Sequence, residues 1–182
     1  RSGTYVGWKE KCKNNYKNGL DENKKIIIAQ SWVRTEKNPL ECVTDKCHLT
    51  GDYYKDLETQ LKEPIELYGK NNKIYILGEL PKPKDKTSII CLRSEILTGV
   101  KQHCNSISEP VAESKRVNKI LKKLTSNYDN VVFIDLTGVF CNEKVCDYAL
   151  NGKALFMPDG GHLSGYGSEI AWNYVVNHIK SN

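Results

Sequence analysis

An aspartate and a histidine lie three residues apart in a glycine-rich loop near the C-terminal end of the sequence. The loop covers residues 156–167 and contains Asp159 and His162. A carboxylate that accepts the imidazole N–H holds the ring in the tautomer whose other nitrogen removes a proton from a serine hydroxyl. The glycines permit a tight backbone path and leave room for a substrate. We interpret the pair as the acid and base of a triad; the alternative is a turn at Asp159 with His162 capping the next helix.

Three short apolar runs alternate with helical patterns along the chain, at residues 25–30, 73–78 and 130–135. Continuous apolar character is typical of strands that are buried on both faces. Strands that alternate with helices form a parallel sheet with right-handed crossovers. We therefore predict an α/β fold, a three-layer α/β/α sandwich of flavodoxin-like type, whose site lies beyond the carboxyl ends of the strands.

Apolar residues at helical spacing predict the elements between and after these strands. One helix covers residues 53–68 and contains Pro64. A second helix begins after Pro110 and carries Val117, Ile120, Leu121 and Leu124 on one face. A last helix follows the Asp159 loop, with Ser164 or Ser168 as its N-cap and Ala171, Tyr174, Val175 and His178 or Ile179 on its inner face.

The length of 182 residues is enough for one sizeable core, so we predict a single domain over residues 1–182. The net charge of +5 comes from scattered lysines, which does not favour a nucleic-acid partner. No apolar stretch approaches the roughly 18 to 20 residues that span a bilayer. The sequence begins at Arg1 with neither an initiator methionine nor a signal peptide, which predicts the C-terminal portion of a longer protein.

Seven cysteines are many for a cytosolic protein of this length. Most of them form near pairs, and the spacings permit local disulfides, which would place the protein in an oxidising compartment. The pairs are Cys42 with Cys47, Cys91 with Cys104, which bracket a short helix, and Cys141 with Cys146. Cys12 is left over, which points to a partner upstream. A zinc site with Cys42, Cys47 and His48, or free buried thiols, are the alternatives.

The order of several motifs resembles the SGNH hydrolase superfamily, in which the aspartate and histidine of the triad lie three residues apart. The resemblance is closest to the periplasmic C-terminal SGNH domain of membrane-bound acyltransferase-3 family proteins of the O-antigen acetylase type. It is carried by residues 26–32, residues 74–77 leading into Pro81, the Cys91-Leu92 step, residues 133–135, Cys141 with Cys146, and residues 159–164.

This resemblance implies acetyl transfer to a cell-surface polysaccharide such as lipopolysaccharide O-antigen, with His162 and Asp159 in a Ser-His-Asp mechanism. It also implies a membrane acyltransferase domain upstream that delivers the acyl donor and tethers a periplasmic or extracellular domain to the inner membrane. The mechanism requires no metal or organic cofactor.

The sequence departs from the family at the nucleophile, because no Gly-Asp-Ser occurs in it and Gly51-Asp52 is followed by Tyr53. We therefore predict that the nucleophile and the first strand lie outside this chain, and that the chain alone is inactive. Ser2 and Ser31 are poor substitutes because neither lies in a nucleophile elbow. Gln30, Ser31 and Arg34, after the first strand, are candidate oxyanion donors, and Trp32 walls a substrate pocket or packs in the core.

A second hypothesis is a non-catalytic, disulfide-braced domain that binds carbohydrate or serves as a scaffold. Ten tyrosines and three tryptophans would supply faces on which sugars stack. A Gly-Asp-Ser motif and transmembrane helices upstream of Arg1 would favour the enzyme, and their absence would favour the binding domain.

Overall fold

The computed structural model describes residues 23–33, 48, 50–82, 87–100, 107–142 and 145–181. Several residues named above lie outside these ranges: Ser2, Cys12, Arg34, Cys42, Cys47 and Cys104. The two local disulfides predicted at Cys42–Cys47 and Cys91–Cys104, and the alternative zinc site, therefore stay predictions.

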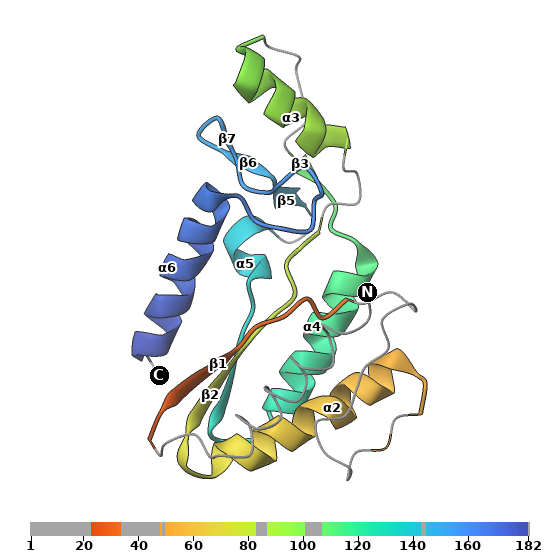
Figure 1. Cartoon of the computed structure of the whole chain (residues 1–182), viewed down its shortest axis with the longest axis vertical. Coiled ribbons are helices and arrows are strands. Elements are labelled where there is room, and N and C mark those ends of the chain that lie inside the picture. Colours follow the sequence, from red (N-terminus) through yellow and green to blue (C-terminus); the bar gives the residue numbers. More distant parts are fainter. Residues whose placement is uncertain are drawn as a thin grey trace, which may run out of the picture. The chain divides into compact units, whose positions relative to one another are not determined.

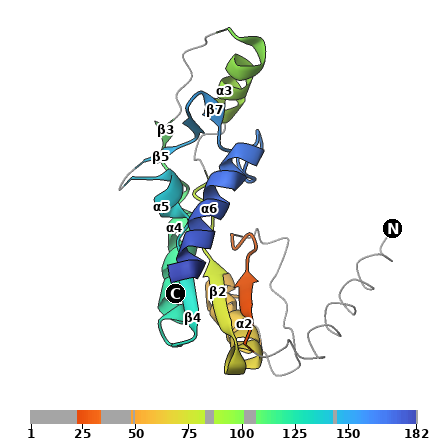
Figure 2. The same ribbon diagram turned by 90° about the vertical axis from the view of Figure 1, so that its left-hand side faces the viewer.

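A parallel three-stranded sheet contains the three apolar runs that the sequence predicts as strands. The strands are β1 (Lys25–Ile28), β2 (Lys73–Leu77) and β4 (Val131–Ile134), and their order in the sheet is β1-β2-β4. β1 pairs with β2 in parallel, with Ile26 opposite Ile74 (Figures 1 and 2). The predicted α/β class with a parallel sheet is confirmed.

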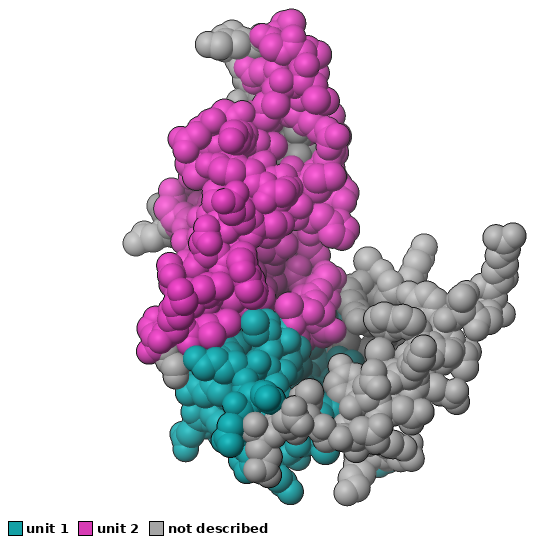
Figure 3. Space-filling model, turned by 60° about the vertical axis from the view of Figure 1, so that its left-hand side comes forward, with its two compact units in different colours: residues 1–28, 34–76, 123–132 teal, residues 29–33, 77–122, 133–182 magenta. Residues whose placement is uncertain are grey.

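The chain divides into two compact units, which Figure 3 shows in different colours. The first unit contains residues 1–28, 34–76 and 123–132, and the second contains residues 29–33, 77–122 and 133–182. Strands β2 and β4 each contribute residues to both units. The single domain stays a prediction.

The first unit is built around helix α2 (Tyr53–Tyr68), which Figures 1 and 2 both place beside β2. Asp52 caps the helix, because its side chain accepts hydrogen bonds from the backbone N–H groups of Tyr54 and Lys55. Leu57, Leu61 and Ile65 recur at a spacing of four and are buried. Pro64 lies inside the helix without ending it, and the short 3-10 helix η1 (Gly69–Asn71) follows.

The second unit contains most of the remaining elements. Its helices are α3 (Thr87–Thr98), most of α4 (Ala112–Thr125), α5 (Thr137–Phe140) and α6 (Gly165–Ser181). Two short antiparallel pairs join β3 (Ile107–Ser108) to β5 (Cys146–Asp147) and β6 (Ala149–Leu150) to β7 (Lys153–Ala154). A buried cluster joins α5, β5 and α6: Phe140, Cys146, Tyr148, Leu155, Phe156 and Ala171.

The second unit departs from the sequence prediction at α3. We expected a short helix between Cys91 and Cys104. The structure instead has a helix that begins at Thr87 and contains Cys91. The apolar residues of α3 do not mark one face, since Ile90, Ile96 and Leu97 are exposed, so helical periodicity did not reveal its bounds.

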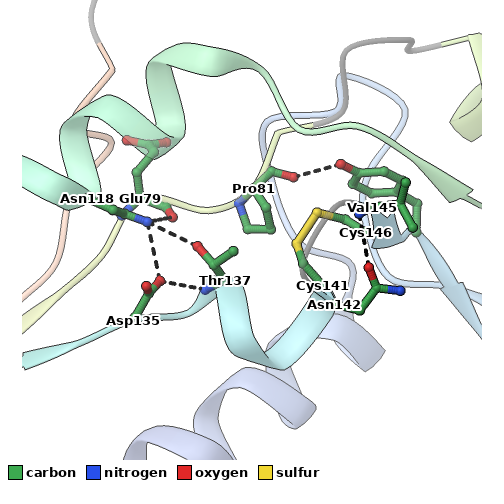
Figure 4. Close-up of a disulfide and its surroundings, with 10 residues drawn as sticks. Glu79, Pro81, Asn118, Asp135, Thr137, Cys141, Asn142, Val145 and Cys146 are labelled. Atoms are coloured by element: carbon green, nitrogen blue, oxygen red, sulfur yellow. Dashed lines mark hydrogen bonds between the residues drawn. A yellow bond between two sulfur atoms is a disulfide. The ribbon is translucent and has the colours of Figure 1, made fainter.

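The predicted disulfide between Cys141 and Cys146 is present and closes the segment between α5 and β5 (Figure 4). Within this segment, Asn142 donates its backbone N–H to Val145 O and accepts from Val145 N at its side chain. The disulfide thus braces a tight turn beside the buried cluster. Cys91 is disulfide-bonded as well.

Candidate functional site

The loop that carries Asp159 and His162 is a closed turn in the second unit. Phe156 and Leu163 form an antiparallel bridge at its base, and Met157 N donates to His162 O at 2.8 Å. At its tip, Gly160 has φ of +67°, a left-handed conformation in which glycine is favoured. These contacts fix the backbone of both residues.

Asp159 uses its two carboxylate oxygens differently. Oδ1 accepts hydrogen bonds from the backbone N–H groups of Gly161 and His162, at 2.7 and 3.0 Å. Oδ2 lies 2.7 Å from Nδ1 of the His162 ring. Forming the turn requires only the first oxygen. The second orients the imidazole, and because Nδ1 is the donor in this contact, Nε2 is the acceptor that remains.

These hydrogen bonds lower the pKa of Asp159 to about 2, and the contact with the His162 side chain is the largest cause. The carboxylate is therefore ionised at neutral pH. The side chains of His162 and Asp159 are 82% and 54% exposed. The ring is thus fixed by its partner while it stays accessible to another molecule.

The titration of Asp159 provides a test of this contact. The pKa of the folded state lies below the ordinary value of 3.8, so the contact stabilises the fold above about pH 3.8. That contribution is lost as the pH falls through about 2. We expect the carbon-13 NMR signal of the Asp159 carboxyl to titrate near pH 2, and nearer its ordinary value in the His162→Ala variant. A midpoint near 4 in the unaltered protein would show that the ring does not engage the carboxylate.

His162 lines a cleft of about 700 Å³ in the second unit. The cleft is surrounded by residues that follow the carboxyl ends of β1, β2 and β4, by the Asp159 loop and by α6. Its polar lining includes Gln30, Ser31, Glu79 and Lys82, and its apolar lining includes Leu77, Leu136, Ala171 and Trp172. The structure therefore brings His162 together with two of the candidate oxyanion donors, Gln30 and Ser31.

Trp32 occupies a different environment from its neighbours. Gln30 and Ser31 are exposed, whereas Trp32 is fully buried and is not among the residues that line the cleft. Its Nε1 donates to Leu77 O at 2.7 Å, and its backbone N–H donates to the Glu79 carboxylate. Trp32 thus anchors the segment after β1 to the segment after β2.

Glu79 and Lys82 belong to the cleft, and no motif in the sequence singled them out. The Glu79 side chain is 2% exposed, and it accepts hydrogen bonds from the backbone N–H groups of Trp32 and Val33. Lys82 Nζ lies 2.9 Å from Glu79 Oε1 and donates to Ser31 Oγ at 3.0 Å. These contacts connect residues up to 51 positions apart, so a local pattern does not show them.

Asn118 of α4 fixes the backbone of Glu79. Its side-chain oxygen accepts from Glu79 N at 2.6 Å, and its amide group donates to Glu79 O at 3.1 Å. The same amide group points toward Asp135 and Thr137, which follow β4 (Figure 4). Buried amides with satisfied donors and acceptors hold a backbone in one position. The carboxylate at the edge of the cleft is therefore fixed.

The described part of the chain contains neither a metal-binding cluster nor a membrane-spanning helix. Among those residues, no group of three or more His, Cys, Asp or Glu side chains is placed to hold a metal ion. No helix within the same residues has both the length and the apolar character needed to cross a membrane.

Two solved structures are similar to this chain in the path of the backbone, over 70% of its residues. One is a putative platelet activating factor from Streptococcus pneumonia, at 19% identity and a TM-score of 0.42. The other is the lipopolysaccharide acetyltransferase periplasmic domain of Salmonella ser. Paratyphi A, at 20% identity and a TM-score of 0.49. The chain spans about half the length of each, 50% and 49%. At these scores neither structure bears on function.

Curated proteins with significant similarity to the chain were not found. A family model described as the SGNH domain fused to AT3 domains matches residues 2–173. This match covers nearly the whole sequence and includes both Asp159 and His162. The chain belongs to this family of SGNH domains that are fused to AT3 domains.

Proposed function

We propose that the chain is the SGNH portion of an O-acyltransferase or acetylesterase, with His162 as general base and Asp159 as the carboxylate that orients it. The observation that carries this proposal is the 2.7 Å contact between Asp159 Oδ2 and His162 Nδ1 at the rim of a cleft. Family membership supports it, because the SGNH domains of this family are fused to acyltransferase domains.

The reaction would proceed by two acyl transfers. His162 Nε2 takes the proton of a serine hydroxyl as the serine oxygen attacks the carbonyl carbon of the acyl donor. The tetrahedral intermediate collapses, the donor's leaving group departs with the proton from His162, and the serine carries the acyl ester. His162 then takes the proton of an acceptor hydroxyl or of water as its oxygen attacks the ester. When the second tetrahedral intermediate collapses, His162 gives this proton to the serine oxygen, and the serine is free again.

We place the serine outside these 182 residues, because no Gly-Asp-Ser motif occurs in them. Gln30 and Ser31 are proposed to donate hydrogen bonds to the oxyanion, since both line the cleft with His162. Arg34 stays a candidate for the same role.

The proposed acceptor is a cell-surface polysaccharide such as lipopolysaccharide O-antigen. Trp172 of α6 lines the cleft and is itself 53% exposed. An exposed indole face beside hydrogen-bonding side chains suits a pyranose ring, which stacks its C–H groups on aromatic surfaces. The acceptor hydroxyl would then lie in the same cleft as His162.

We propose that the domain works in the periplasm or outside the cell, tethered to the inner membrane by an acyltransferase domain that supplies the acyl donor. Two observations support this location. The family is defined by fusion to AT3 domains, and the Cys141–Cys146 disulfide is typical of oxidising compartments.

The isolated chain and the intact protein are expected to differ in activity. The 182 residues alone should hydrolyse p-nitrophenyl acetate no faster than free imidazole, because they lack the nucleophile. The intact protein should acetylate its polysaccharide, which the O-acetyl signals in proton NMR spectra of the extracted polymer would report. Turnover by the isolated chain of about 1 per second or more would place the nucleophile within these residues and contradict the proposal.

A non-catalytic carbohydrate-binding role is the second candidate, and the exposed Trp172 favours it independently of any nucleophile. The two functions separate cleanly in the intact protein. A binding domain would lose polysaccharide affinity in Trp172→Ala and stay unaffected by His162→Ala, whereas an acyltransferase would lose turnover in His162→Ala.

A further inference from the structure

A nearly buried carboxylate at the edge of the cleft has no role in the mechanism above. Glu79 accepts hydrogen bonds from Trp32 N and Val33 N on one oxygen and contacts the Lys82 ammonium group through the other. Burying an ionised carboxylate is unfavourable unless hydrogen bonds and an opposite charge compensate it. Glu79 has both kinds of partner, so it is a fixed negative charge that holds Lys82.

Lys82 extends this network to the cleft surface. Its side chain is 23% exposed, and its Nζ donates to Ser31 Oγ at 3.0 Å while it contacts Glu79. An ammonium group that donates to a hydroxyl oxygen occupies a lone pair of that oxygen and polarises its O–H bond. Ser31 Oγ donates to Val33 O over a long distance of 3.4 Å, and a better acceptor in the cleft would replace this contact.

A serine hydroxyl beside a lysine side chain can have either of two roles. In the first, a neutral lysine amine removes the serine proton and makes the serine a nucleophile. Here Lys82 Nζ forms an ion pair with the Glu79 carboxylate at 2.9 Å, and an ammonium group has no lone pair with which to accept a proton. The second role fits these contacts: Ser31 donates a hydrogen bond, and Lys82 orients the Ser31 hydroxyl.

We propose that Lys82, held by Glu79, is a positioning residue that directs the Ser31 hydroxyl toward the acyl carbonyl oxygen in the His162 cleft. This inference rests on the proposed acyl transfer, and it adds that Glu79 and Lys82 orient the Ser31 hydroxyl as an oxyanion donor. The polarised O–H would bind the carbonyl oxygen most strongly when it becomes negative in the tetrahedral intermediate. A donor of this kind should affect kcat rather than KM.

A double-mutant cycle in the intact protein tests the coupling between the two residues. We expect Ser31→Ala to lower kcat for acetyl transfer about 100-fold with KM changed less than about threefold. Lys82→Met should lower kcat about tenfold or more, and the double variant should be no slower than Ser31→Ala alone. Lys82→Arg, which keeps the charge and the donors, should recover most of the rate lost in Lys82→Met.

Controls separate this role from effects on folding. Lys82→Met leaves the Glu79 charge without its cation, so Glu79→Gln/Lys82→Met, which removes both charges, should fold normally and show the same loss in kcat. Ser126→Ala, an exposed serine outside the cleft, should retain full activity. Two results would overturn the inference, provided that His162→Ala is inactive. One is a loss of kcat in the double variant equal to the product of the two single losses, and the other is an unchanged kcat in Ser31→Ala. Full activity in His162→Ala would instead reject the proposed function itself.

Discussion

Replacement of His162 by alanine in the intact protein is expected to lower kcat for acyl transfer by about 10⁴- to 10⁶-fold. The variant keeps the loop backbone, because the Met157–His162 and Asp159–Gly161 hydrogen bonds involve main-chain atoms of His162 and Gly161. It loses only the imidazole that takes and returns the proton. Initial rates of acetyl transfer to purified polysaccharide, with circular dichroism spectra to verify folding, would measure the loss.

Two further variants complete this experiment: Asp159→Asn tests the carboxylate, and His48→Ala is the control. The asparagine can still accept the two backbone hydrogen bonds of the turn but no longer stabilises an imidazolium, so we expect a loss of about 10⁴-fold. His48 is exposed and does not line the cleft, so its replacement should leave the rate unchanged. Retention of full activity by His162→Ala would mean that the contact between Asp159 and the His162 ring has no part in catalysis.

The sheet could be predicted because its signal is local and strong. Each strand is a continuous apolar run, and the alternation with helices permits few topologies other than a parallel sheet. Helix α6 was predicted for the same reason, with Ser164 or Ser168 as its cap. In the structure Ser164 Oγ accepts from Gly167 N at 3.0 Å, and Ala171 and Val175 are buried. The strands β3, β5, β6 and β7 have two residues each, too few for any periodicity.

The candidate site was predictable only in its local part. Asp159 and His162 are three residues apart, so the turn that joins them is encoded within one loop. Glu79, Lys82 and Asn118 make contacts with residues that lie 39 to 51 positions away in the sequence and that meet only in the folded chain. A lone glutamate or lysine has no spacing from which such a partner can be inferred. Trp32 shows the same limit, since a tryptophan after a strand is compatible with core packing and with a pocket wall, and the structure places it in the core.

The close approach of α6 to the chain before the Asp159 loop predicts a large effect on stability. A Cβ atom on Gly167 would lie 2.1 Å from Leu155 O and 2.9 Å from the Leu155 carbonyl carbon, both backbone atoms of a buried residue. Leu155 is also tied to Ser164 and Tyr148 by backbone hydrogen bonds, so it cannot move away without breaking them. The first turn of α6, which follows His162, therefore requires glycine at this position.

Gly167→Ala is accordingly expected to lower the free energy of unfolding by about 2 to 3 kcal/mol, although alanine is favoured over glycine in most helices. For a chain of this size that corresponds to a decrease in Tm of roughly 5 to 10 °C, which calorimetry or thermal circular dichroism would detect. The matched control is Gly165→Ala at the start of the same helix, where an added Cβ meets no atom within 4 Å. The control should keep the original Tm or exceed it. Equal Tm values for the two variants would show that α6 does not pack against the Leu155 backbone. The contact between α6 and Leu155 would then not explain how His162, which precedes that helix, is positioned.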